Sequence, residues 1–446
     1  MKINPQIFRG YDIRGIWKKD LTKEVFQKIG FALSKKGKKF LVGYDIRKSS
    51  PYLAKALISG LVTRGGEVFF AKRGNFGLIL FSGLRAKVDF TLFVTASHLP
   101  AEWNGLKLYR GDGMPVSPAK IKREVLKLEE KKICFKKPKA KIVNFKRDYI
   151  NFLFQKFSFL KSSRLKVILD CGGGATTLVA PQLFKKFFKI KEIFSKTDPY
   201  FRGRPSEPKE EALGKLKSAV LKEKAHFGVA FDGDGDRGVI IDDKGRYLRG
   251  DIVGIILAKD FLKTSKNKKI VKTISCSMKV EEILKKFGAQ IIESPVGHTF
   301  VAQYCKKYKA ILGMEESSHI LMPRILPFDD ALLIPLKLGE ILLKTKKKLS
   351  QIVNEIGIYP FGEFVFKVPD EIKFKIVDDL GKELKRKYKI STLDGVKIYF
   401  DDGWILIRGS QTSPKIRLYV EAKTKKRFKE LKEKFSQILK EKLCSV

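Results

Sequence analysis

The chain has 446 residues, a length that suggests two to four domains, and its hydrophobic content of 43% is sufficient for buried cores. The N-terminal stretch has no apolar signal-peptide core and no apolar run is long enough to span a membrane, so we expect a cytoplasmic protein without a membrane partner. The five cysteines are scattered and form no CxxC pair, which argues against a disulfide framework and against a zinc site.

The formal net charge is +44, from 92 basic and 48 acidic residues. A strongly basic surface can bind nucleic acid or an anionic membrane. The lysines are spread along the whole chain, however, and many lie on the polar faces of predicted helices. We therefore interpret the charge as a solvated lysine-rich surface that attracts anionic substrates, and we favour phosphorylated metabolites over nucleic acid.

The first 150 residues alternate between predicted strands and helices, which is typical of an α/β unit with a mostly parallel sheet. They begin with a loop that carries two Arg-Gly pairs around Tyr11 and includes Arg14. Either an anion site or a salt-bridged turn would use these arginines. Strands are predicted over 40–44, 67–71 and 90–94, and helices over 23–35, 52–64 and 118–132.

Ser97 and His98 follow the third of these strands in the sequence TASHLP. No GxSxG motif surrounds Ser97, so a serine hydrolase is not indicated. Ser97 is instead a candidate carrier of a phosphoryl group, with His98 and Lys107 beside it. We expect residues 104–107 to form a turn that brings Lys107 back toward this loop. An ordinary Ser/Pro turn is the alternative reading of this stretch.

The second unit is predicted from strands 165–170 and 226–231 and a helix over 211–224. Its last strand runs into FDGDGDRG, where Asp232, Asp234 and Asp236 alternate with glycines. Glycines permit a tight turn, and the spacing of two can direct three carboxylates to one point, which suits Mg²⁺. Arg237 is placed to hold a phosphate beside the metal. A plain Asp-Gly hairpin is the alternative, whereas an EF-hand lacks its closing glutamate here.

A third α/β unit begins with a helix opened by residues 249–251. Strands are predicted over 270–275, 290–293 and 310–313, and helices over 280–287 and 330–343. The loop that contains His298 follows one strand, and GMEESSH follows another. The side chains of Glu315, Ser317 and His319 offer hydrogen bonds to a polyol, although the two glutamates could equally cap a helix.

After residue 360 the pattern changes to α+β. We predict strands over 362–368 and 418–422, a hairpin over 396–407, a helix over 372–388 and a terminal helix. The intervening sequence RGSQTSPKIR combines arginines, a lysine and hydroxyls, which suits phosphate binding, with a plain basic loop as the alternative.

Five motifs occur in this order: FRGYDIRG, TASHLP with NGLK, FDGDGDR, GMEESSH and RGSQTSPKIR. They resemble the motifs of the α-D-phosphohexomutase family, which includes phosphomannomutase and phosphoglucomutase, and the resemblance covers essentially the whole chain. It implies three related α/β domains with mixed sheets and a smaller C-terminal α+β domain around a central cleft. The implied domains span 1–150, 151–250, 251–358 and 359–446.

The resemblance also implies an activity. Ser97 would carry a phosphoryl group, and Mg²⁺ would be held by Ser97, Asp232, Asp234 and Asp236. The phosphoryl group would pass to a hexose 1- or 6-phosphate, of mannose or glucose, and the bisphosphorylated sugar would return its other phosphoryl group to Ser97. Hexose 1,6-bisphosphate would act as activator, and the protein would be a monomer or homodimer.

Roles for the remaining residues follow from the same resemblance. Arg14, His98 and Lys107 would surround the transfer, with His98 or Lys107 as proton carrier. The implied substrate-binding residues are Tyr11, Arg237, His298, Glu315, Ser317 and His319. The distal phosphate would be held by Arg408, Ser410, Gln411, Thr412 and Arg417.

The sequence departs from the family pattern at several positions. Leu99 replaces the usual asparagine, Met314 and Ser318 replace common glycines, and Gln411 and Ser413 also differ. These departures bear on substrate preference rather than on the reaction class. Glu316 favours mannose or glucose phosphate over glucosamine phosphate. The alternatives that remain are a phosphoglucosamine mutase, a sugar-phosphate phosphatase and a basic nucleic-acid-binding protein.

Overall fold

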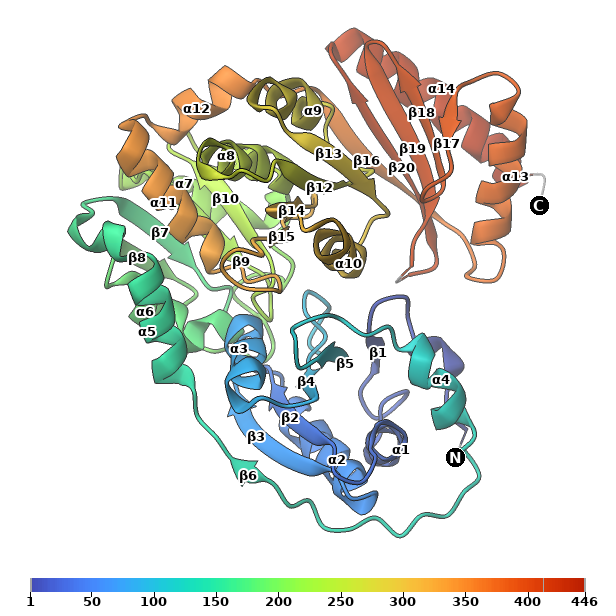
Figure 1. Ribbon diagram of the computed structural model, residues 1–446. Helices are drawn as coiled ribbons and strands as arrows, with labels where there is room; N and C mark the ends of the chain where they lie inside the picture. The colour runs from blue at the N-terminus through green and yellow to red at the C-terminus, as the bar shows by residue number, and fades with distance from the viewer. Residues whose placement is uncertain (1, 412, 445–446) are drawn as a thin grey trace.

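The computed structural model describes residues 2–411 and 413–444, so Thr412 lies outside the described residues. The chain forms four consecutive units, each built on its own sheet, and Figure 1 shows them in an arc from the blue N-terminal unit to the red C-terminal one. The predicted fold class, three α/β units followed by a smaller α+β unit, is confirmed. No helix of the described part of the chain is long and apolar enough to cross a membrane.

The first unit has a mixed sheet with the strand order β1-β5-β4-β2-β3-β6. β2 pairs in parallel with β3 and β4, whereas β5 runs antiparallel between β4 and β1. The strands are β1 (Ile13–Ile16), β2 (Lys39–Tyr44), β3 (Glu67–Arg73), β4 (Phe90–Val94), β5 (Trp103–Arg110) and β6 (Lys141–Ile142). The helices are α1 (Lys23–Leu33), α2 (Ser50–Thr63), α3 (Phe76–Ala86) and α4 (Ala119–Leu126).

Residues 104–107, predicted to form a turn, lie inside β5 instead, so that prediction was wrong. Asn-Gly is a local turn signal, but pairing with β1 and β4 on both sides outweighs it. Gly105 permits this close pairing, since a Cβ atom there would lie 2.1 Å from the carbonyl oxygen of Ile13. The strand places Lys107 opposite Phe93 and so, as expected, beside the Ser97 loop.

The second unit has the strand order β11-β10-β9-β7-β8, and β9 and β10 form a completely buried antiparallel hairpin. The third has the order β13-β12-β14-β15. The second unit contains α5 (Lys146–Lys156), β7 (Lys166–Asp170), α6 (Ala180–Phe184), β8 (Lys189–Ile193), α7 (Gly214–Lys222), β9 (Phe227–Phe231), β10 (Gly238–Asp242) and β11 (Tyr247–Leu248). The third contains α8 (Gly250–Thr264), β12 (Lys269–Thr273), α9 (Lys279–Leu284), β13 (Gln290–Ser294), α10 (His298–Tyr308), β14 (Leu312–Met314), β15 (Ile320–Leu321), α11 (Leu333–Thr345) and α12 (Leu349–Ile356).

The fourth unit is an antiparallel sheet, β16-β20-β19-β18-β17, covered by two helices. Its strands are β16 (Phe361–Lys367), β17 (Ile390–Ser391), β18 (Val396–Phe400), β19 (Gly403–Gly409) and β20 (Lys415–Ala422), and its helices are α13 (Lys373–Lys385) and α14 (Lys425–Cys444). Short 3₁₀ helices are η1 (Pro5–Ile7), η2 (Ser158–Ser162), η3 (Ala175–Leu178), η4 (Glu210–Leu213) and η5 (Lys285–Phe287).

The apolar core explains how these units are joined. One large cluster runs through the first three units and includes Phe76 of α3, Tyr149 of α5 and Leu336 of α11. The fourth unit has a separate core, and only a small cluster around Trp404 and Ile274 joins it to the third. Because burial of apolar surface is the main force that holds units together, the first three form one block and the fourth is attached more weakly.

Candidate active site

Ser97 lies at the carboxyl end of β4 in a strained conformation. Its side chain is buried, and its φ of 49° is in the left-handed region, which costs a non-glycine residue about 1–2 kcal/mol. Two hydrogen bonds hold it there. The Ser97 amide donates to Thr95 Oγ1 over 2.9 Å, and the Ser97 carbonyl accepts from Arg47 Nη2 over 2.8 Å. Strain that the surroundings maintain in this way is characteristic of functional sites.

Arg47 organises the whole loop that follows Ser97. It is fully buried, donates to the carbonyls of Leu99 over 2.6 Å and Trp103 over 3.1 Å, and forms an ion pair with Asp45 over 3.1 Å. Burial lowers the pKa of Arg47, against the opposing charge of Asp45. Neither residue of this supporting pair was among the residues predicted from the sequence.

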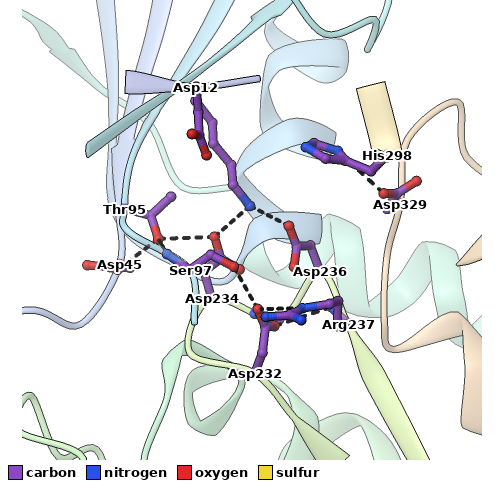
Figure 2. A network of polar contacts seen from close by, with 12 residues as sticks. Asp12, Asp45, Thr95, Ser97, Asp232, Asp234, Asp236, Arg237, His298 and Asp329 are labelled. Carbon is purple, nitrogen blue, oxygen red and sulfur yellow. Dashed lines mark hydrogen bonds and ion pairs between the residues drawn. The ribbon is translucent and has the colours of Figure 1, made fainter. Parts of the chain in front are cut away.

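The acidic loop closes over Ser97 from the second unit. Ser97 Oγ donates to Asp232 Oδ2 over 2.7 Å, a contact that Figure 2 shows at the centre of the polar network. Each carboxylate of Asp232, Asp234 and Asp236 offers an oxygen, and these atoms lie within 4.8 Å of one another. The loop connects β9 to β10, and the Asp234 carbonyl accepts a hydrogen bond from the first residue of α3 over 2.8 Å.

These three carboxylates fit a hard divalent cation. Within the described chain, Asp234 Oδ1 and Asp236 Oδ1 are buried and accept no hydrogen bond, which is costly unless a cation is bound. Burial raises the pKa of Asp232 and of Asp234, and a neighbouring carboxylate adds to each shift. Carboxylate oxygens are the ligands that Mg²⁺ prefers, so the donor set and its uncompensated charge both suit this ion.

Lys107 supplies positive charge to the same cluster. Its ammonium group lies 2.9 Å from Asp234 Oδ2 and also forms an ion pair with Asp236. Burial alone would lower the pKa of Lys107, but the charges of Asp234, Asp236 and Asp232 outweigh burial and raise it. Lys107 is therefore an ammonium ion throughout the physiological pH range.

Arg237 is the second buried cation beside Ser97. Its guanidinium lies 3.5 Å from Asp232 Oδ2 and 3.5 Å from Glu207 Oε1, while Nη2 is buried without a hydrogen-bond partner among the described residues. Burial opposes its charge, but the carboxylates of Asp232 and Glu207 raise its pKa. A guanidinium with an unpaired donor next to the phosphorylatable serine suits a phosphoryl oxygen.

Unlike Lys107 and Arg237, His98 is uncharged. The desolvation of its ring and the positive charges of Arg237 and Arg14 hold the pKa of His98 well below its usual range. The imidazole is thus neutral at pH 7 and can accept a proton. Arg14 itself lies on β1 and is paired with Asp12 over 2.8 Å, so this arginine is both charged and fixed in position.

Most of the predicted substrate-binding residues lie on the third unit. His298 and His319 stack with ring centroids 5.0 Å apart, and His319 Nδ1 lies 3.1 Å from Asp329 Oδ2. Burial disfavours the charged ring, but Asp236 and Asp329 raise the pKa of His319 to about 9. Burial raises the pKa of Glu315 to about 8, so Glu315 is predominantly protonated at pH 7.

Ser317 and Tyr11 are the remaining predicted substrate-binding residues. Ser317 Oγ lies 3.3 Å from Glu315 Oε2, on the loop between β14 and β15. The Tyr11 hydroxyl donates to the Val296 carbonyl, and its ring meets the His298 ring edge-on at 6.2 Å. Tyr11 thus connects the N-terminal loop to the Val296–His298 segment of the third unit. Burial raises the pKa of the Tyr11 hydroxyl.

The predicted phosphate-binding residues lie on the fourth unit. Arg408 Nε is 2.8 Å from Asp394 Oδ2, and Arg408 Nη2 is buried without a partner among the described residues. Arg417 lies directly opposite Arg408 across β19 and β20 and forms an ion pair with Glu363. Ser410 Oγ lies 2.9 Å from Ser413 Oγ, and a Cβ atom on Gly10 would lie 3.2 Å from Gln411 Cβ.

The structure brings most of the predicted residues together and adds several that sequence reasoning missed. Ser97, Lys107, the three aspartates and Arg237 form one contact network, and the histidines, Glu315 and Tyr11 line its third-unit side. The missed residues act as partners of the predicted ones, and they are Asp12, Asp45, Arg47, Glu207, Asp329 and Asp394. Each lies within or beside a turn, where a charged residue is ordinary and gives no distinct signal.

Comparison with known proteins places the chain in a family. The phosphoglucomutase/phosphomannomutase family models match over alpha/beta/alpha domain I at residues 5–132, domain II at 147–245, domain III at 249–359 and the C-terminal domain at 365–438. The chain belongs to the phosphoglucomutase/phosphomannomutase family. The resemblance that the five motifs indicated is therefore confirmed, and this family member is an enzyme of the phosphohexomutase class.

Individual relatives are similar along their full length. The chain is 34% identical to a phosphomannomutase of Methanocaldococcus jannaschii, with 97% of each chain covered. It is 31% identical to a probable phosphoglucosamine mutase of Methanosarcina acetivorans, with 98% of this chain and 100% of the relative covered. The crystal structure of a phosphoglucomutase/phosphomannomutase family protein from Burkholderia thailandensis matches with a TM-score of 0.88 and 25% identity, covering 99% of this chain and 98% of the other.

Members of this family use Mg²⁺, and the acidic cluster of Asp232, Asp234 and Asp236 fits that requirement. A phosphorylated hexose likewise fits a mutase of this family as the substrate. The named relatives include a phosphomannomutase and a probable phosphoglucosamine mutase, whose names refer to different phosphorylated sugars.

Proposed function

We propose that this family member interconverts the 1-phosphate and 6-phosphate of mannose or glucose through a phosphoserine at Ser97. The observation that carries the proposal is the hydrogen bond of 2.7 Å between the strained Ser97 and Asp232, inside a buried cluster of three carboxylates and two cations. Such a cluster suits the transfer of a phosphoryl group, because charge compensation dominates the catalysis of that reaction.

The proposed transfer exchanges one P–O bond for another. The bond between phosphorus and Ser97 Oγ breaks as a bond forms between phosphorus and a hydroxyl oxygen of the bound hexose phosphate. The charge on the moving phosphoryl oxygens is compensated by the ammonium group of Lys107 and the unpaired guanidinium donor of Arg237. Mg²⁺, when bound by Asp232, Asp234 and Asp236, compensates charge at the same oxygens.

The proton of the attacking hydroxyl needs an acceptor, and the two proposed carriers differ in this respect. Lys107 is already protonated because three aspartates raise its pKa. His98 is neutral because its surroundings lower its pKa. We therefore propose His98 as the proton acceptor and Lys107 as a charged donor of hydrogen bonds.

The product of this half reaction is a bisphosphorylated hexose. It must turn over so that its second phosphoryl group faces Ser97, while the distal phosphate is held by the fourth unit. Arg408 has a buried, unpaired donor for this purpose, and Glu315 and Ser317 offer hydroxyl-binding groups. Transfer back to Ser97 Oγ then releases the isomeric monophosphate, and hexose 1,6-bisphosphate charges the unphosphorylated enzyme.

The test is turnover of mannose 1-phosphate, glucose 1-phosphate and glucosamine 1-phosphate with Mg²⁺ and a trace of the hexose 1,6-bisphosphate. We expect conversion to the 6-phosphate and phosphorylation of Ser97 in the intact mass spectrum, and we expect both to be lost in Ser97→Ala. Ser82→Ala, at another buried serine in the same unit, is the matched control and should keep the activity.

Other outcomes identify the rival functions. Release of inorganic phosphate without a bisphosphate requirement would show a phosphatase. Preferential turnover of glucosamine 1-phosphate would contradict the proposed sugar, for which Glu316 was the sequence argument. Glu316 Oε2 accepts a hydrogen bond of 2.5 Å from Ser275 on the third unit, so Ser275→Ala tests whether this contact sets the ratio of turnover between the sugars.

A further inference from the structure

A groove on the outer side of the first unit lies away from the acidic cluster. It has a volume of about 700 Å³ and is bounded by the loop after β1, by α1 and α2, and by residues 135–138. The predicted helix over 118–132 ends at Leu126, and Figure 1 shows the chain then running around the outside of α1 and α2 toward β6. This extended segment forms the outer wall of the groove.

The outer wall is fixed to the helices by specific contacts. Ser59 Oγ of α2 donates to the Lys136 carbonyl over 2.7 Å, and the Lys136 amide donates to Thr63 Oγ1 over 2.9 Å. The Phe135 ring packs edge-on against Phe31 with centroids 6.4 Å apart. Backbone and side-chain contacts therefore hold residues 135–136 in a defined position, and the groove is part of the fold.

The floor of the groove is a stacked aromatic pair. The rings of Trp17 and Tyr52 are nearly parallel, at 22°, with centroids 6.2 Å apart, and Tyr52 is 65% exposed. Lys18 Nζ lies 5.0 Å from the centre of the Trp17 ring. An exposed aromatic pair of this kind is a platform on which a planar heterocycle can stack.

The rim carries an excess of positive charge. Five lysines line the groove, no described lining residue is acidic, and none of the five lysines forms an ion pair within residues 2–411 and 413–444. They are Lys18, Lys23, Lys55, Lys136 and Lys137. By contrast, the buried cations Lys107 and Arg237 of the acidic cluster are paired with carboxylates. Unpaired lysines around a confined space favour a ligand with several negative charges.

We propose that this groove binds a nucleoside polyphosphate, with the base stacked on Trp17 and Tyr52 and the phosphates among the lysines. The aromatic floor favours a planar ring, and the lysine rim favours several phosphates. A ligand with only one of these parts therefore makes only one of the two sets of contacts and binds more weakly. A hexose phosphate lacks the ring, which distinguishes this ligand from the proposed substrate.

Backbone contacts connect the groove to the segment that follows Ser97. The Trp17 amide donates to the Glu102 carbonyl over 3.0 Å, and Ile16 pairs with Trp103 at the start of β5. Trp103 is in turn held by Arg47, which also holds Ser97. The direct readout of the proposal is nevertheless binding, so its outcome is independent of whether the mutase activity is found.

The experiment is isothermal titration calorimetry of the full chain at 0.1 M salt with ATP, adenosine, inorganic tripolyphosphate and a single-stranded RNA oligomer as separate probes. We expect one ATP per chain, bound at least tenfold more tightly than adenosine or tripolyphosphate. The affinity for ATP should fall at least tenfold in Tyr52→Ala and in the double variant Lys136→Glu/Lys137→Glu.

A charge-matched control is the double variant Lys285→Glu/Lys286→Glu, at two exposed lysines of the third unit, which should bind ATP like the wild type. Thermal unfolding of each variant verifies that it is folded. Tripolyphosphate that binds as tightly as ATP would overturn the proposal, as would equal loss in the groove and control variants. RNA binding in the absence of ATP binding would overturn it in favour of a nucleic-acid surface.

Discussion

At the scale of single residues, two serines near the candidate active site have a backbone conformation that glycine would adopt more readily. Ser97 has a φ of 49° and Ser318 a φ of 73°. Arg47 maintains the strain at Ser97, the proposed phosphoryl carrier. Ser318 has a buried hydroxyl without a hydrogen-bond partner among the described residues. The common glycine of the family at position 318 is explained by this backbone conformation.

Arg47→Lys is expected to loosen the Ser97 loop. Lysine keeps the charge but lacks the planar fork that reaches the Ser97, Leu99 and Trp103 carbonyls together. We expect the free energy of unfolding to fall by about 2–4 kcal/mol, because buried acceptors lose their donors. Urea denaturation measures this change, and intact mass spectrometry measures slower phosphorylation of Ser97.

The control for this variant is Arg64→Lys at the exposed end of α2, where Arg64 donates one long hydrogen bond of 3.4 Å to the Phe31 carbonyl and lies over the Phe31 ring. It should change stability by less than about 0.5 kcal/mol. Equal effects of the two substitutions would show that Arg47 has no special role in the loop.

Ser318→Gly is expected to stabilise the protein. The substitution removes the left-handed strain of Ser318 and its unpaired buried hydroxyl, which outweighs the greater entropy of glycine in the unfolded chain. We expect the free energy of unfolding to rise by about 0.5–1 kcal/mol, measured by urea denaturation. Ser317→Gly on the same loop, where φ is not positive, should destabilise instead, and the reverse order would contradict this explanation.

At the scale of elements, one buried contact joins three of the packed units. Tyr149 of α5 donates to Asp330 Oδ2 over 2.5 Å, just before α11. A Cβ atom on Gly77 of α3 would lie within 2.4 Å of the Tyr149 hydroxyl oxygen, so α3 closes over this contact. The neighbouring Ala331 amide lies 3.4 Å from the Gly235 carbonyl of the acidic loop. The contact thus fixes the loop that presents Asp329 to His319.

Asp330 should make stability depend on pH. Burial raises its pKa from 3.8 to about 7. A carboxyl group that holds its proton more tightly in the folded state stabilises the fold fully below about pH 4, and this contribution is lost as the pH rises toward 7. The free energy of unfolding of the wild type relative to Asp330→Asn should therefore decline by up to about 4 kcal/mol between pH 4 and 7.5.

Urea denaturation at three pH values across this range measures the difference. The exposed Asp378→Asn on α13 is the control, and its difference from the wild type should stay constant. If the wild type lost the same stability with pH relative to both variants, or lost none relative to Asp330→Asn, the Tyr149–Asp330 contact would not titrate in this range.

At the scale of the whole molecule, the N-terminal loop closes the cleft between the first unit and the fourth. Arg9 forms an ion pair with Asp370 over 2.9 Å, and Gly10 packs against Gln411. The fourth unit shares little core with the other three. We therefore expect the fourth unit to move relative to the other three when a hexose phosphate binds, and we expect the Arg9–Asp370 pair to oppose that movement.

Arg9→Ala is expected to shift the molecule toward an open cleft. The half-buried pair contributes about 1 kcal/mol, which corresponds to about a fivefold change in the ratio of open to closed molecules. We expect a larger radius of gyration in small-angle X-ray scattering and a higher KM for the hexose phosphate. Lys382→Ala, at an exposed ion pair on α13, should change neither quantity. An unchanged scattering curve for Arg9→Ala would contradict this closing role.

The sequence by itself determined the class of fold and the five motifs, and it supplied most of the residues that we propose to react. Alternating apolar strands and amphipathic helices are local patterns, so most of the element positions could be read directly. The chemistry of the acidic loop could also be predicted, because Asp232, Asp234 and Asp236 are close in the chain and their spacing alone brings them together.

The tertiary structure decided what depends on contacts between distant residues. Residues 104–107 become a strand because β1 and β4 pair with them from both sides, which the local Asn-Gly signal does not reveal. Arg47 and Asp329 support Ser97 and His319 from 50 and 10 residues away. The proposal of His98 rather than Lys107 as proton acceptor also needed the structure, because protonation depends on burial and on charges that the fold assembles.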